Sequence, residues 1–409
     1  MGPDATLKIL FLCHRYPFPP RDGGKLRAMK MIEHLSRVHD VFVVSMIRDD
    51  EEAEHAAGLK DFCAGFEAPR VSPLGQLLRT GLAPLQARPL SFGYFRSPAV
   101  QRIVDRWTST IGFDRIVAYS SSMGPYVSAV ADVPRLLDFC DMDSEKWLMY
   151  ARAQGLPKSL MFRYEYAAVA RQERRLAAAF DLSTVATPTE LQTLRDRCGD
   201  DRCAWFPNGV DLQYFSPLDQ PCDPDLLCFV GRMDYLPNVR CVEQVCTQVL
   251  PLIREHRPQA RFAIVGSRPN QIVRKLGELP GVEVTGTVPD VRPWLGRASA
   301  MLAPLDIARG TQNKVLEAMA MGVPVITSAL VRQGLADEAG KELIVAESAE
   351  QIARSAVELM NDSQHRGRLS EASRAVVQRI YGWEGAMSRF ESLLTDLTRR
   401  PEPVRGRHS

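Results

Sequence analysis

The chain has 409 residues, which is enough for two or three domains of about 150 residues that each bury a core. Hydrophobic residues make up 45% of it and charged residues 24%, a composition typical of a globular protein and unlike that of a disordered one. The 51 basic and 49 acidic side chains leave a formal net charge of +2, so the overall charge gives no reason to expect a nucleic-acid partner.

The nine cysteines are scattered, and no two have the Cys-x2-Cys spacing of a zinc site. We therefore expect reduced thiols and no bound metal, as in a cytoplasmic protein. No apolar run approaches the roughly 18 residues of a membrane span. Any membrane contact is expected to be peripheral, on the inner face of the cell membrane.

Short apolar runs alternate with amphipathic stretches along the whole chain, which predicts an α/β protein with parallel sheets and crossover helices. The strands predicted in the first half are Leu7 to Cys13, Val41 to Ile47, Arg115 to Tyr119, Arg135 to Phe139 and Leu182 to Ala186. A helix is predicted at Leu26 to Val38, after the first strand.

Two stretches of the first half differ in charge. Residues 49–67 carry seven acids and one lysine, which predicts a solvated connection with a short helix. Residues 68–104 contain no acid, and five arginines are interleaved there with leucines and aromatic residues. Such a segment either lies on an anionic membrane surface or forms a helical excursion packed on the domain.

The second half repeats the alternation. Its predicted strands are Leu226 to Gly231, Arg261 to Gly266, Val282 to Gly286, Ala300 to Leu305, Val323 to Thr327 and Leu343 to Ala346. Helices are predicted at Asn238 to Glu255 and Lys314 to Met321, and prolines mark a boundary near residues 205–225. Two doubly wound, Rossmann-like domains that face each other across a cleft follow from this pattern.

Two glycine-containing loops are the first candidates for chemistry, because doubly wound sheets bind ligands at the carboxyl ends of their strands. Gly23 and Gly24 open the helix after the first strand, where free amides favour a phosphate or an oxygen-rich acceptor. A tight turn forced by the preceding prolines explains the same glycines. Because the spacing is not Gly-x-Gly-x-x-Gly, a nicotinamide dehydrogenase is disfavoured.

The second loop lies in Pro304–Ile326, where a strand ends, a polar loop turns and a helix starts near Asn313. Lys314 and Glu317 are three residues apart and share one face of this helix. A cation and helix amides suit a phosphate, and a carboxylate one turn later suits the hydroxyls of a ribose. The two side chains would otherwise simply pair on the surface.

This segment resembles the donor-binding signature of the retaining family-4 (group 1) glycosyltransferases of GT-B fold. Phe206–Asp211 is similar to the interdomain turn of that family, and Phe229–Arg232 to the phosphate-binding turn of its second domain. Asp138–Trp147 and Met233–Asn238 look like the sugar transferases of exosortase (PEP-CTERM) exopolysaccharide systems.

The resemblance implies a domain for each substrate. Residues 1–205 would form the acceptor-binding domain, 206–380 the nucleotide-sugar domain, 381–398 a helix crossing back to the first domain, and 399–409 a flexible tail. The enzyme would be a metal-independent hexosyltransferase that needs no cofactor and moves a sugar from a nucleoside diphosphate sugar to a lipid-linked glycan, with retention.

Site residues follow from the same resemblance. Arg232 and Lys314 would hold the diphosphate and stabilise its growing charge, which makes them catalytic, and Glu317 would hold the ribose. The loop residues Arg309, Gly310 and Thr311 would complete the donor site.

Two positions depart from the family. Arg309 stands where the first glutamate of its Glu-x7-Glu pair is expected, so the hexose cannot be carried over. Asn238 replaces the family's second diphosphate ligand, a lysine, and Lys314 is the residue that can supply the missing charge, with Asn238 as an alternate.

Asp141, at the end of a strand in the first domain, is our candidate for orienting the acceptor or the donor sugar. Asp138 and Asp143 are its alternates, and acids in such a loop also serve as helix caps. Two other functions stay open: a nucleotide-sugar epimerase of the same fold, and a nucleotide-sugar-binding scaffold that has lost turnover.

Overall fold

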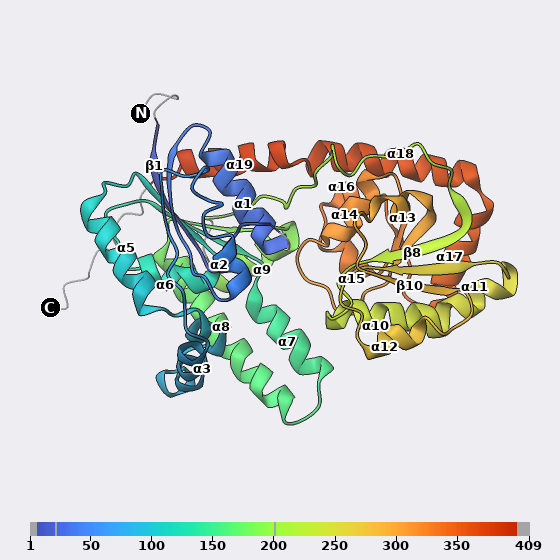
Figure 1. The fold of residues 1–409 in the computed structure, drawn as a ribbon, viewed down its shortest axis with the longest axis horizontal. Helices are drawn as coiled ribbons and strands as arrows, with labels where there is room; N and C mark the ends of the chain where they lie inside the picture. The colour runs from blue at the N-terminus through green and yellow to red at the C-terminus, as the bar shows by residue number, and fades with distance from the viewer. Residues whose placement is uncertain (1–5, 21–22, 200–201, 399–409) are drawn as a thin grey trace. The chain divides into compact units, whose positions relative to one another are not determined.

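The computed structural model describes residues 6–20, 23–199 and 202–398. Its contacts divide the chain into two units (Figure 1). One unit contains the residues up to Ala186, Glu190–Phe206 and the residues from Met387 on, and the other contains Thr187–Thr189 and Pro207–Ala386. The predicted tail, 399–409, lies outside the described residues.

The first unit is built on a parallel sheet, in which the described residues form seven strands in the order β3-β2-β1-β4-β5-β6-β7. The strands are β1 (Lys8–Cys13), β2 (Asp40–Val44), β3 (Gly65–Glu67), β4 (Arg115–Tyr119), β5 (Arg135–Cys140), β6 (Leu182–Val185) and β7 (Cys203–Trp205). The strand order reverses between β1 and β4, which is the topology of a doubly wound domain and confirms the predicted fold class.

Helices separate these strands along the chain. They are α1 (Gly23–Leu35), α2 (Asp50–Glu54), α3 (Pro73–Leu82), α4 (Leu90–Phe95), α5 (Pro98–Thr110), α6 (Gly124–Val127), α7 (Asp143–Ala153), α8 (Lys158–Ala179) and α9 (Pro188–Cys198), with single 3-10 turns at Pro84–Gln86 and Ser121–Met123. In β1 every residue from Ile9 to Cys13 is fully buried, as a parallel strand covered by helices on both faces requires.

The second unit has its own parallel sheet, in which the described residues form six strands in the order β10-β9-β8-β11-β12-β13. The strands are β8 (Asp223–Val230), β9 (Arg261–Val265), β10 (Val282–Gly286), β11 (Ala298–Ala303), β12 (Val325–Thr327) and β13 (Ile344–Val345). Its helices are α10 (Leu236–Gln244), a π turn (Val245–Val249), α11 (Leu250–His256), α12 (Gln271–Leu276), α13 (Arg292–Arg297), α14 (Asn313–Ala320), α15 (Ala329–Arg332), α16 (Asp337–Gly340), α17 (Ala349–Asn361) and α18 (Ser363–Ile380).

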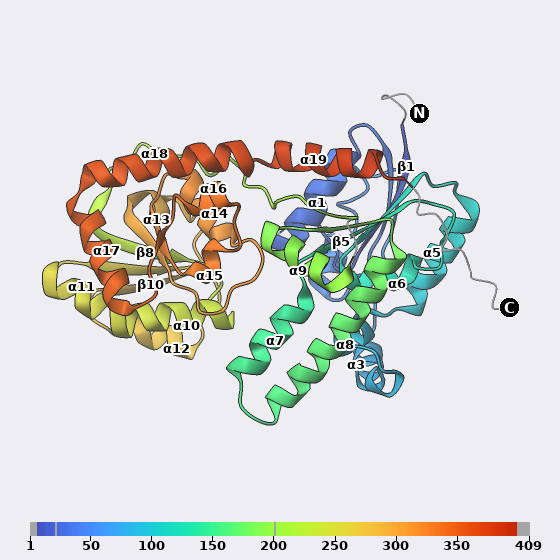
Figure 2. The ribbon, with the colours of Figure 1, turned by 180° about the vertical axis from the view of Figure 1, so that it is seen from behind.

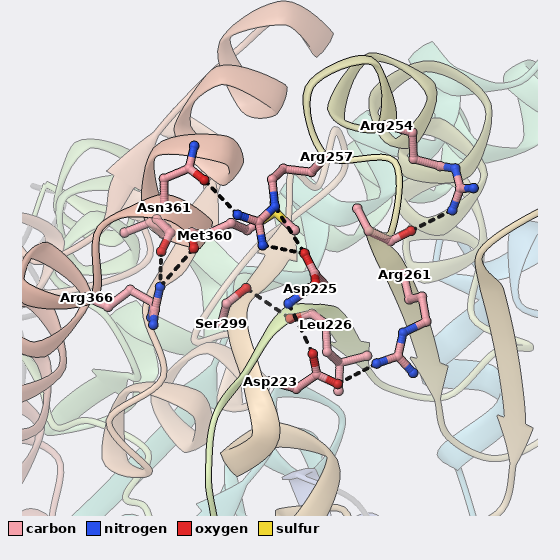
Figure 3. Close-up of polar contacts among 12 residues, drawn as sticks. Asp223, Asp225, Leu226, Arg254, Arg257, Arg261, Ser299, Met360, Asn361 and Arg366 are labelled. Carbon is pink, nitrogen blue, oxygen red and sulfur yellow. Dashed lines mark hydrogen bonds and ion pairs between the residues drawn. The ribbon is translucent and has the colours of Figure 1, made fainter.

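The amino end of β8 is fixed by arginines from neighbouring elements (Figure 3). Arg257 donates from Nε to Asp225 Oδ1 at 3.0 Å and from Nη1 to Asn361 Oδ1 at 2.7 Å, which ties the end of α11 to the start of the strand and to α17. Arg261 pairs with Asp223 at the same edge. These pairs lie at the amino ends of the strands, opposite the edge where ligands bind, so we assign them to stability.

The last helix, α19 (Trp383–Thr395), begins in the second unit and joins the first from Met387 on. The rings of Phe390 and Phe206 lie 5.0 Å apart, and Arg115 Nε donates to the carbonyl of Leu394 at 3.1 Å. The helix therefore packs on the first unit, as predicted.

Several predicted boundaries were wrong in detail. The strand predicted at Val41–Ile47 ends at Val44, and Ile47 forms only an isolated bridge with Arg70. The helix predicted at Asn238–Glu255 starts at Leu236 and contains the π turn at its centre. The strands β3 and β7 were not predicted at all.

No helix within the described ranges is both long enough and apolar enough to cross a bilayer. The nine cysteines all lie in those ranges, and none of them forms a disulfide.

Candidate functional site

In the second unit, the turn after β8 approaches the end of β9 closely. Gly231 N donates to Val265 O at 3.0 Å, and Gly266 has φ +148°. A Cβ atom on Gly266 would lie 1.9 Å from the carbonyl oxygen of Gly231. Only glycine fits at Gly266, and this places Arg232 at the carboxyl end of the sheet.

Arg232 is half exposed and forms a two-pronged ion pair with Asp234. Its Nε and Nη2 atoms lie 3.0 Å from Asp234 Oδ1 and Oδ2, and Arg268 Nη1 lies 3.6 Å from the same carboxylate. The side-chain contacts of Arg232 hold its guanidinium at the surface of the turn, where a phosphate would compete with Asp234 for it.

The helix α14 begins where the polar loop after β11 ends. Val315, Leu316 and Met319 of α14 are buried in the core of the unit, so Lys314 and Glu317 take the opposite, partly buried face. Gly310 has φ +63°, and Gln312 Nε2 donates to the carbonyl of Arg309 at 3.0 Å, which shapes the loop into the helix start.

Two polar atoms at the start of α14 find no hydrogen-bond partner among the described residues. They are Thr311 Oγ1 and Asn313 Oδ1, and both are buried. Because buried polar atoms are almost always satisfied in native proteins, a hydrogen-bonding ligand at this helix end is a physical explanation for both.

Lys314 connects α14 to the turn after β8. Its Nζ donates to Asn238 Oδ1 at 2.6 Å, and Asn238 Nδ2 donates to the carbonyl of Arg232 at 2.8 Å. The ammonium group also lies 5.0 Å from the centre of the Phe229 ring. The ammonium group of Lys314 therefore lies beside the Asn238 side chain. The Asn238 amide orients this ammonium group and also holds the turn after β8 through the carbonyl of Arg232.

Burial shifts the pKa of both charged residues on this face of α14. It lowers the pKa of Lys314 to about 8, against the attraction of Cys241 and Glu317. It raises the pKa of Glu317 to about 7, and the nearby Lys314 partly offsets this. Buried ionisable groups with shifted pKa values gather at ligand-binding sites, which makes this face of α14 a candidate site.

In the first unit, Asp138 belongs to the core. Arg27 donates from Nε to Asp138 Oδ2 at 2.8 Å, and Thr184 Oγ1 and the amide of Cys140 donate to Oδ1 at 3.0 and 3.2 Å. Both side chains of the ion pair are fully buried. A carboxylate with these partners does not reach a ligand, so Asp138 is a structural residue and not an alternate for Asp141.

Asp141 lies at the carboxyl end of β5, after Cys140, whose φ of +63° turns the chain. Its Oδ1 atom is buried and has no hydrogen-bond partner among the described residues. Burial, together with the nearby Asp143, raises the pKa of Asp141 to about 6. Burial also raises the pKa of Asp143, the first residue of α7, whereas Lys146 lowers it.

His14 was not predicted, although it directly follows β1. Its amide donates to Tyr119 O at 3.2 Å, its ring lies 5.0 Å from that of Phe95, and its buried Nδ1 has no hydrogen-bond partner among the described residues. Burial, helped by Arg15, lowers the pKa of His14 to about 3, so the imidazole is neutral. The only signal in the sequence was its place after a strand.

Gly23 and Gly24 form the first turn of α1, and Tyr119 Oη donates to the carbonyl of Gly24 at 3.0 Å. This contact joins the start of α1 to the end of β4. His14 and the glycine turn both follow β1, and Asp141 follows β5. All three therefore lie at the carboxyl edge of one sheet.

The first unit also has an open pocket of about 530 Å³ between the last turn of α1 and residues 61–64. Asp40, which begins β2, lines it, so this pocket lies at the amino edge of the sheet. It contains none of the predicted site residues. No group of three or more His, Cys, Asp or Glu side chains that could hold a metal occurs in the described part of the chain.

Residues 224–362 match the family model described as "Glycosyl transferases group 1". The GDP-mannose-dependent monoacylated alpha-(1-6)-phosphatidylinositol monomannoside mannosyltransferase of Corynebacterium glutamicum is 23% identical over 244 residues, which are 54% of this chain and 64% of that protein. The phosphatidyl-myo-inositol mannosyltransferase of Propionibacterium freudenreichii is 34% identical over 108 residues, 26% of each chain. Each match spans less than two thirds of the relative's length.

Solved structures resemble nearly the whole chain. Anabaena HepE in complex with UDP has a TM-score of 0.67 at 14% identity, and WaaG, a glycosyltransferase involved in lipopolysaccharide biosynthesis, has 0.64 at 17%. The alignments cover 96% and 95% of this chain and all of the other chain. Within the second unit, residues 224–362 thus resemble the glycosyl transferase group 1 family, and the chain has the two-domain GT-B fold.

Proposed function

We propose that the protein transfers a sugar from a nucleoside diphosphate sugar to a hydroxyl group of an acceptor. The observation that carries the proposal is the chain of contacts from Lys314 through Asn238 to Arg232. It brings a lysine and an arginine from distant segments to the carboxyl edge of one sheet, within the segment that matches the group 1 family.

The donor site would be formed by the second unit. Arg232 and Lys314 bind the diphosphate, the loop Arg309–Thr311 with the start of α14 offers further donors, and Glu317 accepts hydrogen bonds from the ribose. As the glycosidic bond breaks, the electron pair passes to the leaving diphosphate, and the two cations stabilise the added charge.

We further propose that the configuration at the sugar is retained and that the leaving phosphate takes the proton of the acceptor hydroxyl. No metal is needed in this scheme, since Arg232 and Lys314 supply the charge. Transfer that survives EDTA supports this, whereas transfer that needs added magnesium or manganese rejects it and makes Asp141 and Asp143 candidate ligands.

The acceptor side would be formed by the first unit. Asp141 has a buried oxygen that lacks a partner, and it orients a sugar hydroxyl, with Asp143 as the alternate. His14, a neutral imidazole at the same edge of the sheet, offers a second hydrogen-bonding atom, and Tyr119 joins the Gly23–Gly24 turn to the end of β4.

For the acceptor we propose a lipid-linked glycan, in the assembly of an exopolysaccharide at the inner face of the cell membrane. The names of both curated relatives describe mannosyltransferases and contain phosphatidylinositol or phosphatidyl-myo-inositol. The resemblance of Asp138–Trp147 and Met233–Asn238 to the exosortase-linked transferases is the sequence observation behind the exopolysaccharide.

The test is an incubation of the full chain with a panel of nucleoside diphosphate sugars, with and without a bacterial lipid extract. The proposal predicts that one donor raises the melting temperature and releases its nucleoside diphosphate only when the extract is present. A sugar altered without any acceptor would identify an epimerase. Donor binding without transfer to any extract would favour a nucleotide-sugar-binding scaffold that has lost turnover. The replacements at Asn238 and Arg309 are the reason to consider this alternative.

A further inference from the structure

Large apolar side chains are exposed mainly in two segments of the first unit. Among the described residues, 17 large hydrophobic side chains are exposed, and ten of them fall between residues 74 and 94 or between 156 and 164. They are Leu74, Leu77, Leu78, Leu82, Leu85, Tyr94, Leu156, Leu160, Met161 and Tyr164. Isolated exposed leucines are ordinary, but a concentration of this kind marks an interaction surface.

The helix α3 is amphipathic with its apolar side turned outward. Leu74, Leu77 and Leu78 lie on one side of it, at the i, i+3 and i+4 spacing, and Leu77 is 70% exposed. The side that faces the protein carries the buried Gln76, whose Nε2 donates to Tyr94 O at 3.4 Å. A helix held to its domain by a polar side chain presents its leucines for something else to cover.

The hairpin of α7 and α8 joins this surface. Tyr164 Oη donates to Arg88 O at 2.9 Å, and the buried Glu165 accepts from the amides of Leu90 and Ser91 at 2.6 and 2.9 Å. Figures 1 and 2 both show α3 beside α8, on the side of the unit from which the hairpin projects. At the tip, Leu156 is 77% exposed.

We call the exposed apolar residues of α3, its following turn and the hairpin tip the leucine surface. It consists of Leu74, Leu77, Leu78, Leu82, Leu85, Leu156, Leu160 and Met161.

The two chain segments that carry the leucine surface are basic in sequence. Residues 71–104 and residues 146–164 contain no acid, and each stretch contains four basic residues. The eight are Arg79, Arg88, Arg96, Arg102, Lys146, Arg152, Lys158 and Arg163. Arg70 is excluded because it pairs with Asp50.

We propose that the leucine surface docks on an anionic lipid membrane, with the leucines in the interface and the surrounding cations on lipid phosphates. Leucines flanked by arginine and lysine are the chemistry of interfacial membrane helices. A second copy of the chain would present the same cations and be repelled, so the charge favours lipid over self-association. The inference deepens the proposed function, since a docked enzyme meets a lipid-linked acceptor, but its test does not depend on transfer.

The experiment is cosedimentation of the full chain with vesicles of phosphatidylcholine containing about 30 mol% phosphatidylglycerol, compared with phosphatidylcholine alone. We expect binding to the anionic vesicles, falling as ionic strength rises. The variant with Leu77→Ser, Leu78→Ser, Leu156→Ser and Leu160→Ser should lose at least about tenfold in affinity for the anionic vesicles. Ile272→Ser with Leu279→Ser, exposed leucine and isoleucine positions of the second unit, is the matched control and should bind like the wild type.

A second variant separates charge from apolar insertion. Arg88→Gln, Lys158→Gln and Arg163→Gln together should remove the preference for anionic over neutral vesicles, because all three exposed cations are lost. The two-residue variant Leu77→Ser, Leu156→Ser is available if the larger leucine variant melts early, and it should show a smaller loss of binding in the same direction.

Three results would overturn the inference. They are wild-type protein that ignores anionic vesicles at low salt, leucine variants that bind as well as the wild type, and wild-type self-association that the leucine substitutions abolish. Calorimetry with a nucleoside diphosphate on the same leucine variant should match the wild type. If the wild type binds no nucleoside diphosphate, the proposed function is rejected, and the vesicle result is unaffected.

Discussion

Lys314 and Glu317 lie one helical turn apart on α14, and the spacing in the sequence was enough to place them on one face. The sequence could not show that Lys314 would meet Asn238, because that contact joins residues 76 positions apart and depends on how α14 packs beside the turn after β8. His14 could not be found for the same reason, since a lone histidine carries no motif. Asp138 and Asp141 look equivalent in the sequence, and only their burial and partners separate them.

The lowered pKa of Lys314 predicts how diphosphate binding depends on pH. Below a pKa of about 8 the ammonium is charged and attracts the diphosphate, and above it the charge is lost as pH rises. Wild-type affinity should therefore fall by up to about tenfold per pH unit above pH 8. In Lys314→Arg the side chain stays charged, so calorimetry should find affinity nearly constant over this range.

Glu317, with a pKa near 7, also titrates close to this range, and Glu317→Gln removes its contribution. If the fall in affinity above pH 8 persists unchanged in Lys314→Arg, Lys314 is not the group responsible.

The raised pKa of Asp141 makes a prediction about stability. Its pKa is about 6 in the folded state and near 3.8 when unfolded, so the folded state binds more protons between these values and stability falls as pH rises through them. Asp143 and Asp138 add to this effect, and Lys146 and Arg27 oppose it. Asp141→Asn should be more stable than the wild type by about 1 to 3 kcal/mol at pH 7.5, and by less at pH 5.

Thermal unfolding at the two pH values measures this difference. Asp61→Asn, an exposed position of the same unit, is the control and should change the melting temperature little at either pH. An Asp141→Asn protein that is less stable than the wild type at pH 7.5 would mean that the carboxylate has a stabilising partner. This would contradict the absence of a hydrogen-bond partner for Asp141 Oδ1 among the described residues.

At the scale of the elements, long apolar runs gave the central strands of both sheets, because a strand buried on both faces must be apolar throughout. The strands β3 and β7 escaped prediction because each has three residues and stands at an edge of the sheet, where little apolar sequence is needed. The π turn at Val245–Val249 escaped as well, since its residues keep the apolar character of a continuous helix.

The close approach of the turn after β8 to the end of β9 predicts that alanine substitutions at two glycines change the free energy of unfolding in opposite directions. Gly266→Ala puts a Cβ atom against the carbonyl of Gly231 and forces φ +148° on alanine, which should lower the free energy of unfolding by about 2 to 4 kcal/mol. Gly367→Ala, in the exposed interior of α18 with nothing within 4 Å, should raise it by about 0.5 to 1 kcal/mol.

Chemical denaturation of both variants gives the two free energies. Equal effects of the two substitutions would show that the close approach of the turn after β8 to the end of β9 is not a constraint on the fold.

At the scale of the whole molecule, alternation of strands and helices was sufficient to predict two doubly wound units, and the structural neighbours share that fold at 14% and 17% identity. The likeness fixes the architecture and leaves the substrates open, because function depends on side chains at the sheet edges and not on the sheets. Asn238 and Arg309 differ from the residues expected at these positions in the family that the sequence resembles. The proposed donor site therefore depends most on these two positions.

The most direct test of the account is the affinity of the full chain for nucleoside diphosphates, measured by calorimetry for the wild type and for Lys314→Ala. The account predicts that one nucleoside diphosphate binds the wild type, and that Lys314→Ala binds it about 1.5 to 3 kcal/mol more weakly, a factor of roughly 10 to 150. Lys341→Ala, an exposed lysine of the same unit, should bind like the wild type. Unchanged affinity in a folded Lys314→Ala protein, or no binding of any nucleoside diphosphate to the wild type, would contradict it.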